Sequence, residues 1–272
     1  MDLVTISAII LFLIVALIFS PLGLGGGVLY VPIFHYILDW GFQESVIGSL
    51  SLVLMVTLGS GLAHSKTGNA EHKIANYGRI SAIPAAIIGT ILSSIIIKYV
   101  GDAAIKFIAI LILLFVFNQT IKKMKMKMNP DDEKQSDYYT PEIIQKYQFG
   151  TAFAGLSSGL LGIGGGAILV TLNRNILKMG TRESSGTSYL VAATIVPISL
   201  LSHLLLDGVV SEIIESTEWL AITFIPFAVS LAAFFGAKFS IGNVPRDVVA
   251  KLFLAAVGLG IIRYLYDLIS RI

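Results

Sequence analysis

Two glycine-rich segments carry the residue types in this sequence that are best suited to hold a ligand. The first is Leu22-Gly23-Leu24-Gly25-Gly26-Gly27, and Leu161-Gly162-Ile163-Gly164-Gly165-Gly166 repeats it with one conservative change. We call residues 23–27 the first glycine break and residues 162–166 the second. Glycine lets backbone N–H groups approach a ligand closely, and a helix that begins there points unpaired N–H groups and its positive dipole end at that ligand. The pattern predicts anion binding by the backbone, without a fixed cationic side chain.

Hydroxyl residues follow both breaks, in Gly48-Ser49-Leu50-Ser51 and in Gly186-Thr187-Ser188. We expect each segment to begin the next helix, where Ser and Thr act as N-caps and supply O–H donors that suit an oxyanion. The predicted anion site therefore combines the glycines of both breaks with these two segments: Gly25, Gly26, Gly27, Gly48, Ser49, Ser51, Gly164, Gly165, Gly166, Gly186, Thr187 and Ser188.

Two histidines occupy equivalent positions after the breaks. His64 and His203 are 139 residues apart, which is also the offset between the two breaks. Because histidine titrates near physiological pH, these residues suggest a proton relay coupled to transport, with an interfacial structural role as the alternative. Glu44 and Glu183 share the same offset and are interpreted as solvated loop residues.

The shared offset of these landmarks indicates an internal duplication. We expect a first membrane repeat over residues 1–121 and a second membrane repeat over residues 147–272. Between them lies a hydrophilic, lysine-containing linker over residues 122–146. The fold therefore depends on the structure of one repeat and on the relative orientation of its two copies.

The composition indicates an integral membrane protein. Of 272 residues, 55% are hydrophobic and 13% are charged, against about 25% charged in soluble domains. Apolar runs recur along nearly the whole chain, so the expected fold is all-α and polytopic, with the lipid bilayer as its surroundings. A net charge of +2 gives no indication of nucleic-acid binding, and the lack of cysteine excludes disulfides and thiolate metal sites. We expect no cofactor and no metal.

The positions of lysine and arginine predict the orientation of the repeats. If the apolar pieces around each break form a hairpin, all basic residues fall on one side with the linker, except Lys98, Lys106, Arg263 and Arg271. If each break interrupted a single span, the repeats would be parallel and the basic residues would divide almost evenly. Basic loops favour the cytoplasm, so we expect two inverted repeats, each with about four long helices plus a glycine-broken helical hairpin. The N-terminus is then outside the plasma membrane and the linker is cytoplasmic.

The small-residue segments also have interpretations other than an anion site. Residues 162–167 match the dinucleotide fingerprint G-x-G-x-x-G/A, but the strand that must precede it is missing. Close helix packing through small residues is a stronger alternative. Gly155-Leu156-Ser157-Ser158-Gly159 fits the G-x-S-x-G pattern of serine hydrolases, with His203 as the base, but the strand-to-helix turn that gives this motif its meaning is absent. We therefore expect no enzyme.

The two breaks and their flanking residues resemble the TauE/SafE family of sulfite and organosulfonate exporters, over essentially the whole chain. The motifs that carry the resemblance are Gly23-Leu24-Gly25-Gly26-Gly27 with Ser60-Gly61-Leu62-Ala63-His64 and Gly68-Asn69, and the second break with Gly186-Thr187-Ser188. The resemblance implies a carrier for small sulfur-containing anions such as sulfite, sulfoacetate or related sulfonates.

These inferences predict a secondary transporter, expected to be an exporter, that works by alternating access with an anion held near the membrane midplane between the breaks. An anion channel would share this site and is the alternative, and an intramembrane serine hydrolase is the third. A homodimer would use the small residues Ala232 and Gly236, or Gly258 and Gly260, unless these pack within one subunit.

Overall fold

A computed structural model describes residues 2–65, 70–125, 139–217, 219–243 and 246–270. All regular elements in these ranges are helices, which confirms the predicted all-α class. Gly68-Asn69 and most of the expected linker lie outside the described residues. In chain order the elements are α1 (Leu3–Phe19), η1 (Ser20–Leu22), α2 (Gly27–Tyr36), α3 (Phe42–Ser65), α4 (His72–Tyr99), α5 (Asp102–Lys125), α6 (Pro141–Leu161), α7 (Gly166–Asn175), α8 (Thr181–Leu206), α9 (Val210–Ser216), α10 (Trp219–Asn243) and α11 (Arg246–Ile269).

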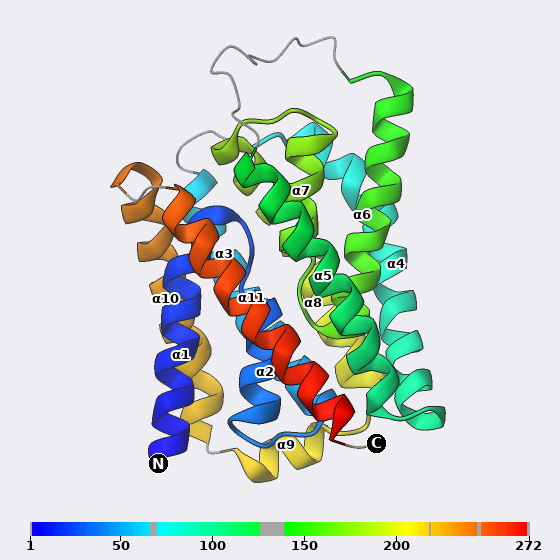
Figure 1. Ribbon diagram of the computed structural model, residues 1–272, viewed down its shortest axis with the longest axis vertical. Helices are drawn as coiled ribbons and strands as arrows, with labels where there is room; N and C mark the ends of the chain where they lie inside the picture. The colour runs from blue at the N-terminus through cyan, green and yellow to red at the C-terminus, as the bar shows by residue number, and fades with distance from the viewer. Residues whose placement is uncertain (1, 66–69, 126–138, 218, 244–245, 271–272) are drawn as a thin grey trace.

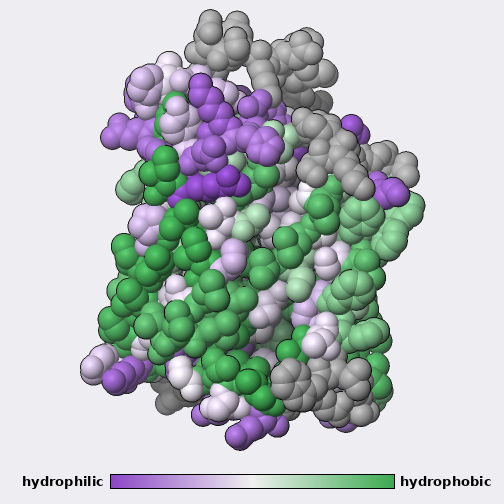
Figure 2. Space-filling view, turned by 180° about the vertical axis from the view of Figure 1, so that it is seen from behind, coloured by the Kyte–Doolittle hydropathy of each residue, from purple (hydrophilic) through white to green (hydrophobic). Residues whose placement is uncertain are grey.

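The helices form a membrane-spanning bundle. Among the described residues, seven are long and apolar enough to cross a bilayer, namely α1, α3, α4, α5, α8, α10 and α11. Figure 2 shows an apolar band around the middle of the molecule, with hydrophilic residues gathered toward both ends. Helices α2 and α7 have 10 residues each, which gives a length of about 15 Å, half of a bilayer core of about 30 Å. Helices α2 and α7 are therefore long enough to cover only about half of the bilayer core.

The element order repeats within the chain. Helices α2 and α7 begin and end at positions that differ by the offset of the duplication, and α1, α3, α4 and α5 correspond to α6, α8, α10 and α11. Contacts repeat too, because α1 packs on α10 as α6 packs on α4, while α3 packs on α8 and α5 on α11. The first long helix of each half thus packs against the other half. Helix α9 has no counterpart among the described residues.

Figure 1 shows the two ends of the molecule, which we call the N-terminal face and the linker face. The N-terminal face holds the start of α1, the end of α2, helix α9 and the end of α11. The linker face holds the end of α5, the start of α6 and helix α7. Helices α1 and α6 start at opposite ends, and α2 and α7 extend from mid-depth toward opposite ends.

Glycines let α4 and α6 pack with their backbones in contact. A Cβ atom on Gly155 would meet the Ala82 carbonyl, and one on Gly159 would meet the Ala86 carbonyl. Toward the linker face, a Cβ on Gly78 would lie 3.3 Å from the side chains of Tyr147 and Thr151. Helices α4 and α6 therefore pack against each other along their length without a gap between them.

Small residues of α10 also pack inside the subunit. A Cβ atom on Gly236 would meet the Leu17 carbonyl of α1, and Ala232 packs against the main hydrophobic core. On α11, the nearest atom to a Cβ on Gly258 is a ring carbon of Phe117 at 3.7 Å, and Gly260 has open space. Of the two expected dimer contacts, the α10 pair serves packing within the subunit.

A buried ion cluster joins α5 and α11 at the N-terminal face. Lys106 Nζ lies 2.8 Å from Asp102 Oδ2 and 2.5 Å from Asp267 Oδ2. The Tyr36 hydroxyl of α2 donates to Asp267, and the Arg263 guanidinium lies 4.2 Å from the centre of the Tyr36 ring. Lys106 and Arg263, which the sequence assigned to the outer side, lie within helices, and two carboxylates compensate the buried charge of Lys106.

Replacing Gly159 with alanine is expected to destabilise the protein by about 1–3 kcal/mol, because the new methyl group would meet backbone atoms of α4 that have no room to move. Gly260→Ala is the matched control, since no atom lies within 4 Å of its Cβ position and it gains the same helix propensity. Thermal unfolding of both variants in detergent measures the difference. Equal midpoints would contradict the close contact of α4 and α6.

Candidate functional site

The two glycine breaks cross each other in the protein interior. A Cβ atom on Gly27 would lie 2.6 Å from the Ile163 carbonyl oxygen, and one on Gly166 would lie 2.7 Å from the Gly23 carbonyl oxygen. Glycine permits this approach because it has no side chain. Gly27 is the first residue of α2 and Gly166 is the first residue of α7. The N-terminal ends of the two half-length helices therefore meet at the crossing.

Both helices begin with the same backbone geometry. Their N-caps, Gly26 and Gly165, have φ angles of 84° and 68°, in the left-handed region that favours glycine. The Gly26 carbonyl accepts the N–H of Leu29 at 2.9 Å, and the Gly165 carbonyl accepts the N–H of Ile168 at 3.1 Å. The N–H groups before these lack partners within the helix, and each dipole adds about half a positive charge. Two positive helix ends facing each other are suited to an anion.

Ser49 and Ser188 hold the crossing together. The Ser49 hydroxyl donates to the Gly162 carbonyl at 2.8 Å, and the Ser188 hydroxyl donates to the Gly23 carbonyl at 3.1 Å. Each hydroxyl also lies 3.4 Å from the carbonyl of the first residue of α2 or α7 in its own half. Both serines are fully buried. The hydroxyl hydrogen atoms of these serines form the hydrogen bonds that join one break to the other, so the serines position the breaks.

Helices α3 and α8 begin earlier than expected, at Phe42 and Thr181. The prediction that Gly48 and Gly186 open these helices is therefore wrong, and two converging helix starts are present where four were expected. The first turns contain Glu44 and Glu183, whose negative charge favours a helix N-terminus. These two glutamates are consequently helical and half-buried, not solvated loop residues.

The remaining predicted hydroxyls lie on either side of the crossing. The Ser51 hydroxyl donates to the Ile47 carbonyl within α3 at 2.9 Å, on the side of the N-terminal face. The Thr187 hydroxyl accepts the backbone N–H of Glu71 at 3.0 Å, beside the start of α4. Ser51 and Thr187 therefore belong to different approaches to the site.

Val53 packs against both breaks. Its Cγ1 atom lies 3.3 Å from the Cβ position of Gly25 and 2.5 Å from that of Gly164. The side chain is 1% exposed. In this conformation Val53 thus fills space between the two breaks.

The two predicted histidines both lie against the helix ends that precede the breaks. The His203 Nε2 atom lies 2.6 Å from the Gly159 carbonyl of α6. The His64 ring lies beside the carbonyl of Ser20, the equivalent residue of the first half, and its centre is 5.6 Å from that of the Tyr189 ring. Both histidines are buried. The duplication therefore places them in matching positions, as the sequence indicated.

Tyr189 makes the two breaks unequal. Its hydroxyl donates to the Ser20 carbonyl at 2.7 Å, and the backbone N–H of Gly25 and the hydroxyl of Ser60 contact the same oxygen. The equivalent residue in the first half is Leu50, which has no polar atom. An internal hydroxyl thus contacts an N–H group of the first break but not the matching N–H group of the second.

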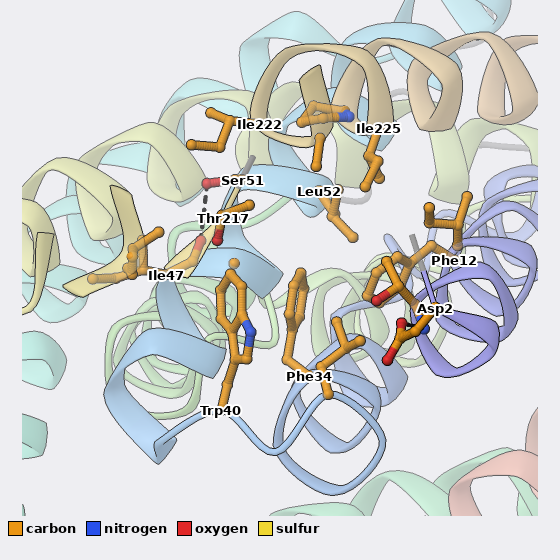
Figure 3. A pocket seen from close by; sticks show the side chains of 17 residues that line it. Asp2, Phe12, Phe34, Trp40, Ile47, Ser51, Leu52, Thr217, Ile222 and Ile225 are labelled. Carbon is orange, nitrogen blue, oxygen red and sulfur yellow. Dashed lines mark hydrogen bonds between the residues drawn. The ribbon is translucent and has the colours of Figure 1, made fainter. Parts of the chain in front are cut away.

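A pocket of about 440 Å³ lies at the N-terminal face (Figure 3). The rings of Phe34 and Trp40 stand side by side on one side of it, and Ile222 and Ile225 of α10 lie opposite. Residues of α3, including Ser51, form the wall between the pocket and the crossing. The pocket therefore reaches the helix that carries Ser49 and Val53, without touching the breaks themselves.

Few polar groups line this pocket. Asp2 caps α1 by accepting the N–H of Thr5 at 2.9 Å, and the hydrogen bonds from the side chain and backbone of Thr5 hold the pKa of the Asp2 carboxyl below its usual value. Asp2 lies outside the membrane spans and is ionised at neutral pH. The Thr217 hydroxyl has no hydrogen-bond partner among the described residues. The mouth of the pocket is thus negative.

The matching region at the linker face is filled. Gly89 of α4 contacts Leu156 of α6 in the same way as Gly236 of α10 contacts Leu17 of α1, so the two glycines occupy equivalent positions. Counting back equally from each glycine makes Ala75 of α4 the equivalent of the pocket residue Ile222 of α10. Ala75 is fully buried, because α4 and α6 pack together there. The structure is open at one end of the duplicated framework and closed at the other.

Arg79 lies at this closed end. By the same register it corresponds to Pro226, another residue of the pocket. Its Nε and Nη2 atoms donate to the Leu190 carbonyl of α8 at 3.1 and 2.6 Å, and Nη1 donates to the Asn76 amide oxygen at 2.7 Å. Both partners are neutral, so the guanidinium brings a net positive charge to the helix that carries Thr187. The sequence pattern placed Arg79 on the side of the linker but gave no sign of this contact.

The candidate hydrolase residues do not meet. The Ser157 hydroxyl donates to the Phe153 carbonyl of its own helix at 2.8 Å, and Ser157 lines an apolar groove with Phe115. His203 instead contacts the Gly159 carbonyl and Asp207. Among the residues that the structure describes, Ser157 therefore has no general base.

A family model described as sulfite exporter TauE/SafE matches residues 8–264. Comparisons with curated proteins and with solved structures found no significant match. The matched region contains both glycine breaks, both histidines and all helices from within α1 to within α11. The family consists of membrane permeases, which agrees with the seven apolar helices of this multi-pass chain. The chain belongs to the sulfite exporter TauE/SafE family, as the resemblance at its glycine breaks predicted.

Proposed function

We propose that this protein is a secondary transporter that exports small sulfur-containing anions, such as sulfite or organosulfonates, across the plasma membrane. The observation that carries the proposal is the meeting of two helix N-termini at the crossed glycine breaks. Two positive helix ends in the protein interior stabilise an anion, and the absence of a fixed cation between them favours its release. The family assignment supports the same substrate class.

The anion is proposed to contact N–H groups of both breaks near the membrane midplane. We assign Gly164, Gly165 and Gly166 the larger share, because Tyr189 contacts the matching N–H of the first break and leaves less of it for a ligand. Ser49 and Ser188 act by fixing the breaks, while Ser51 and Thr187 line the two approaches. Val53 must move for an anion to reach both breaks.

Alternating access is proposed to occur when the two ends of the molecule exchange their open and closed arrangements. The repeats are taken as inverted, which the opposite starting ends of α1 and α6 support. The present conformation is open between α1 and α10 and closed between α4 and α6. A change that closes the first pair and opens the second would present the breaks to the linker face. A channel would require both ends to be open together, so this asymmetry favours a carrier.

The charges at the two ends favour capture of an anion at the linker face, and we propose transport from there to the N-terminal face. Arg79 attracts an anion at the linker face, whereas a carboxylate, that of Asp2, lies at the mouth of the open pocket. With the N-terminus outside and the linker cytoplasmic, this direction is export. A homodimer through the face of α11 around Gly260 stays a prediction.

The proposal predicts saturable flux of ³⁵S-labelled sulfite in proteoliposomes. Gly165→Ala should reduce it about ten-fold or more, because its Cβ would lie 2.9 Å from the Ala154 carbonyl and displace the N–H groups of the second break. Gly208→Ala is the matched control: it has a similar φ of 72°, but no atom lies within 4 Å. Wild-type flux that does not saturate, or equal flux in both variants, would overturn the proposed site.

Alternating access can be tested with single cysteines, because the chain contains none of its own. Ile222→Cys in the open pocket should react with a membrane-impermeant maleimide, whereas Ala75→Cys at the closed end should be protected. Sulfoacetate, which does not add to maleimides as sulfite does, should change the two labelling rates in opposite directions. Two rates that are both high and independent of sulfoacetate would identify a channel instead.

A further inference from the structure

The His203 ring lies between two hydrogen-bond acceptors in the last turn of the α8 span. Its Nε2 atom is 2.6 Å from the Gly159 carbonyl oxygen, and its Nδ1 atom is 2.7 Å from Asp207 Oδ2. The side chains of His203 and Asp207 are both fully buried. The sequence interpretation identified His203 but not its carboxylate partner.

This arrangement requires two protons on the pair. A neutral imidazole carries one N–H, and the carbonyl of Gly159 can only accept, so Nε2 must be protonated. The second proton lies between Nδ1 and Asp207, either on the imidazole beside a carboxylate or on a carboxylic acid beside a neutral ring. Its removal would place the lone pair of Nδ1 against a carboxylate in a medium of low dielectric constant. The structure therefore represents the proton-loaded form of the pair.

The pair connects the helices that close the linker-side approach. The other carboxylate oxygen of Asp207 accepts the Ser94 hydroxyl of α4 at 2.6 Å. Gly159 belongs to α6 and lies three residues before the second break. His203 and Asp207 on α8 are thus bonded to both members of the α4–α6 pair. Loss of the shared proton would make Nδ1 and the carboxylate repel each other, and so would shift the two side chains that contact these helices.

Other acidic groups lie between the pair and the N-terminal face. Glu44 of α3 is in hydrogen-bond contact with Glu212 of α9, and Asp207 is within electrostatic reach of Glu44. Helix α4 faces the pair with the neutral Ser94, and α6 faces it with the neutral Gly159 carbonyl. The electrostatic interaction between Glu44 and Asp207 therefore brings a second carboxyl group near the pair on the side of the N-terminal face.

The sequence of the first half lacks the acid at the equivalent position. The residue four positions after His64 is Gly68, where the second half has Asp207 after His203. A buried ionisable pair at a membrane span is costly and is characteristically found in proton pathways of transporters. Since the duplication retained the histidine in both halves but placed the acid in one, a single proton site is expected.

We propose that His203 and Asp207 form a proton-binding site whose occupancy is coupled to anion movement, so that proton exchange at the N-terminal face accompanies the change in access. The coupling rests on the proposed transport function, whereas the proton site itself does not. Ser94 and Gly159 transmit the change in protonation to α4 and α6.

The proton site is tested by ¹⁵N NMR of protein labelled at its four histidines, with His203→Gln used to assign the signal. We expect the His203 signal to titrate and its midpoint to move when sulfite is added, because coupling between two ligands is reciprocal. In Asp207→Asn the midpoint should no longer respond to sulfite. A His203 signal that is unchanged between about pH 5 and 9, with and without sulfite, would overturn the proposal.

Coupling is tested with ³⁵S-labelled sulfite in proteoliposomes. Asp207→Asn should exchange sulfite at equal pH within about two-fold of wild type, but lose about five-fold or more of the accumulation driven by a pH gradient. Glu215→Gln, on the exposed side of α9, is the control for removing a carboxylate from the same face. Sulfite itself binds protons, so a pH gradient affects its distribution in every sample. Comparing the wild type and the variants under the same gradient removes this contribution.

Three outcomes separate the two proposals. Gradient-driven accumulation in Asp207→Asn equal to wild type overturns the coupling, and so does loss of both activities in a variant that remains folded, since this assigns the pair a structural role. Absence of sulfite exchange in the wild type overturns the transport function. The NMR titration decides the proton site in either case.

Discussion

The contact between the two glycine breaks governs the arrangement of the rest of the bundle. Their backbones meet because Gly27 and Gly166 have no side chain, and the hydroxyls of Ser49 and Ser188 join each break to the other. Helices α3 and α8 supply these serines and pack on each other, so the centre of the protein is built from the same elements of both halves. The long helices then surround this centre, with the first long helix of each half packed on the opposite half. A positive, glycine-lined centre is a consequence of that construction.

Departures from the duplication provide the features that a transporter needs. Tyr189 occupies a position that is leucine in the first half, and Asp207 one that is glycine. One end of the framework is hollowed into the pocket of Figure 3, while the other end is filled by the packing of α4 on α6. The two approaches also differ in charge, with Arg79 at the closed end and Asp2 at the open one. The crossing of the breaks, itself made unequal by Tyr189, thus lies between two ends of the bundle that differ in packing and in charge.

Much of the fold follows from sequence patterns, because apolar length and repeated glycines are strong local signals. The offset of the duplication predicted matching breaks and equivalent histidines. The beginnings of α3 and α8 were wrong because the hydroxyl segments resemble N-caps, while the actual first turns are marked by Glu44 and Glu183. Contacts between distant residues carried no such signal, and so the roles of Arg79 and Lys106 depended on the packing. Asp207 was accessible to sequence reasoning, since it follows His203 at the spacing of one helical turn.

The central claim is that an anion binds where the breaks cross. Selenite has the shape and charge of sulfite, and its selenium atom can be located by anomalous diffraction in crystals of the protein soaked at increasing concentrations. The account predicts a peak within hydrogen-bonding reach of the backbone N–H groups of Gly164–Gly166, with Val53 displaced from between the breaks. A saturating peak confined to another part of the protein, such as the pocket beside Asp2 and Trp40, with the crossing unchanged, would contradict it.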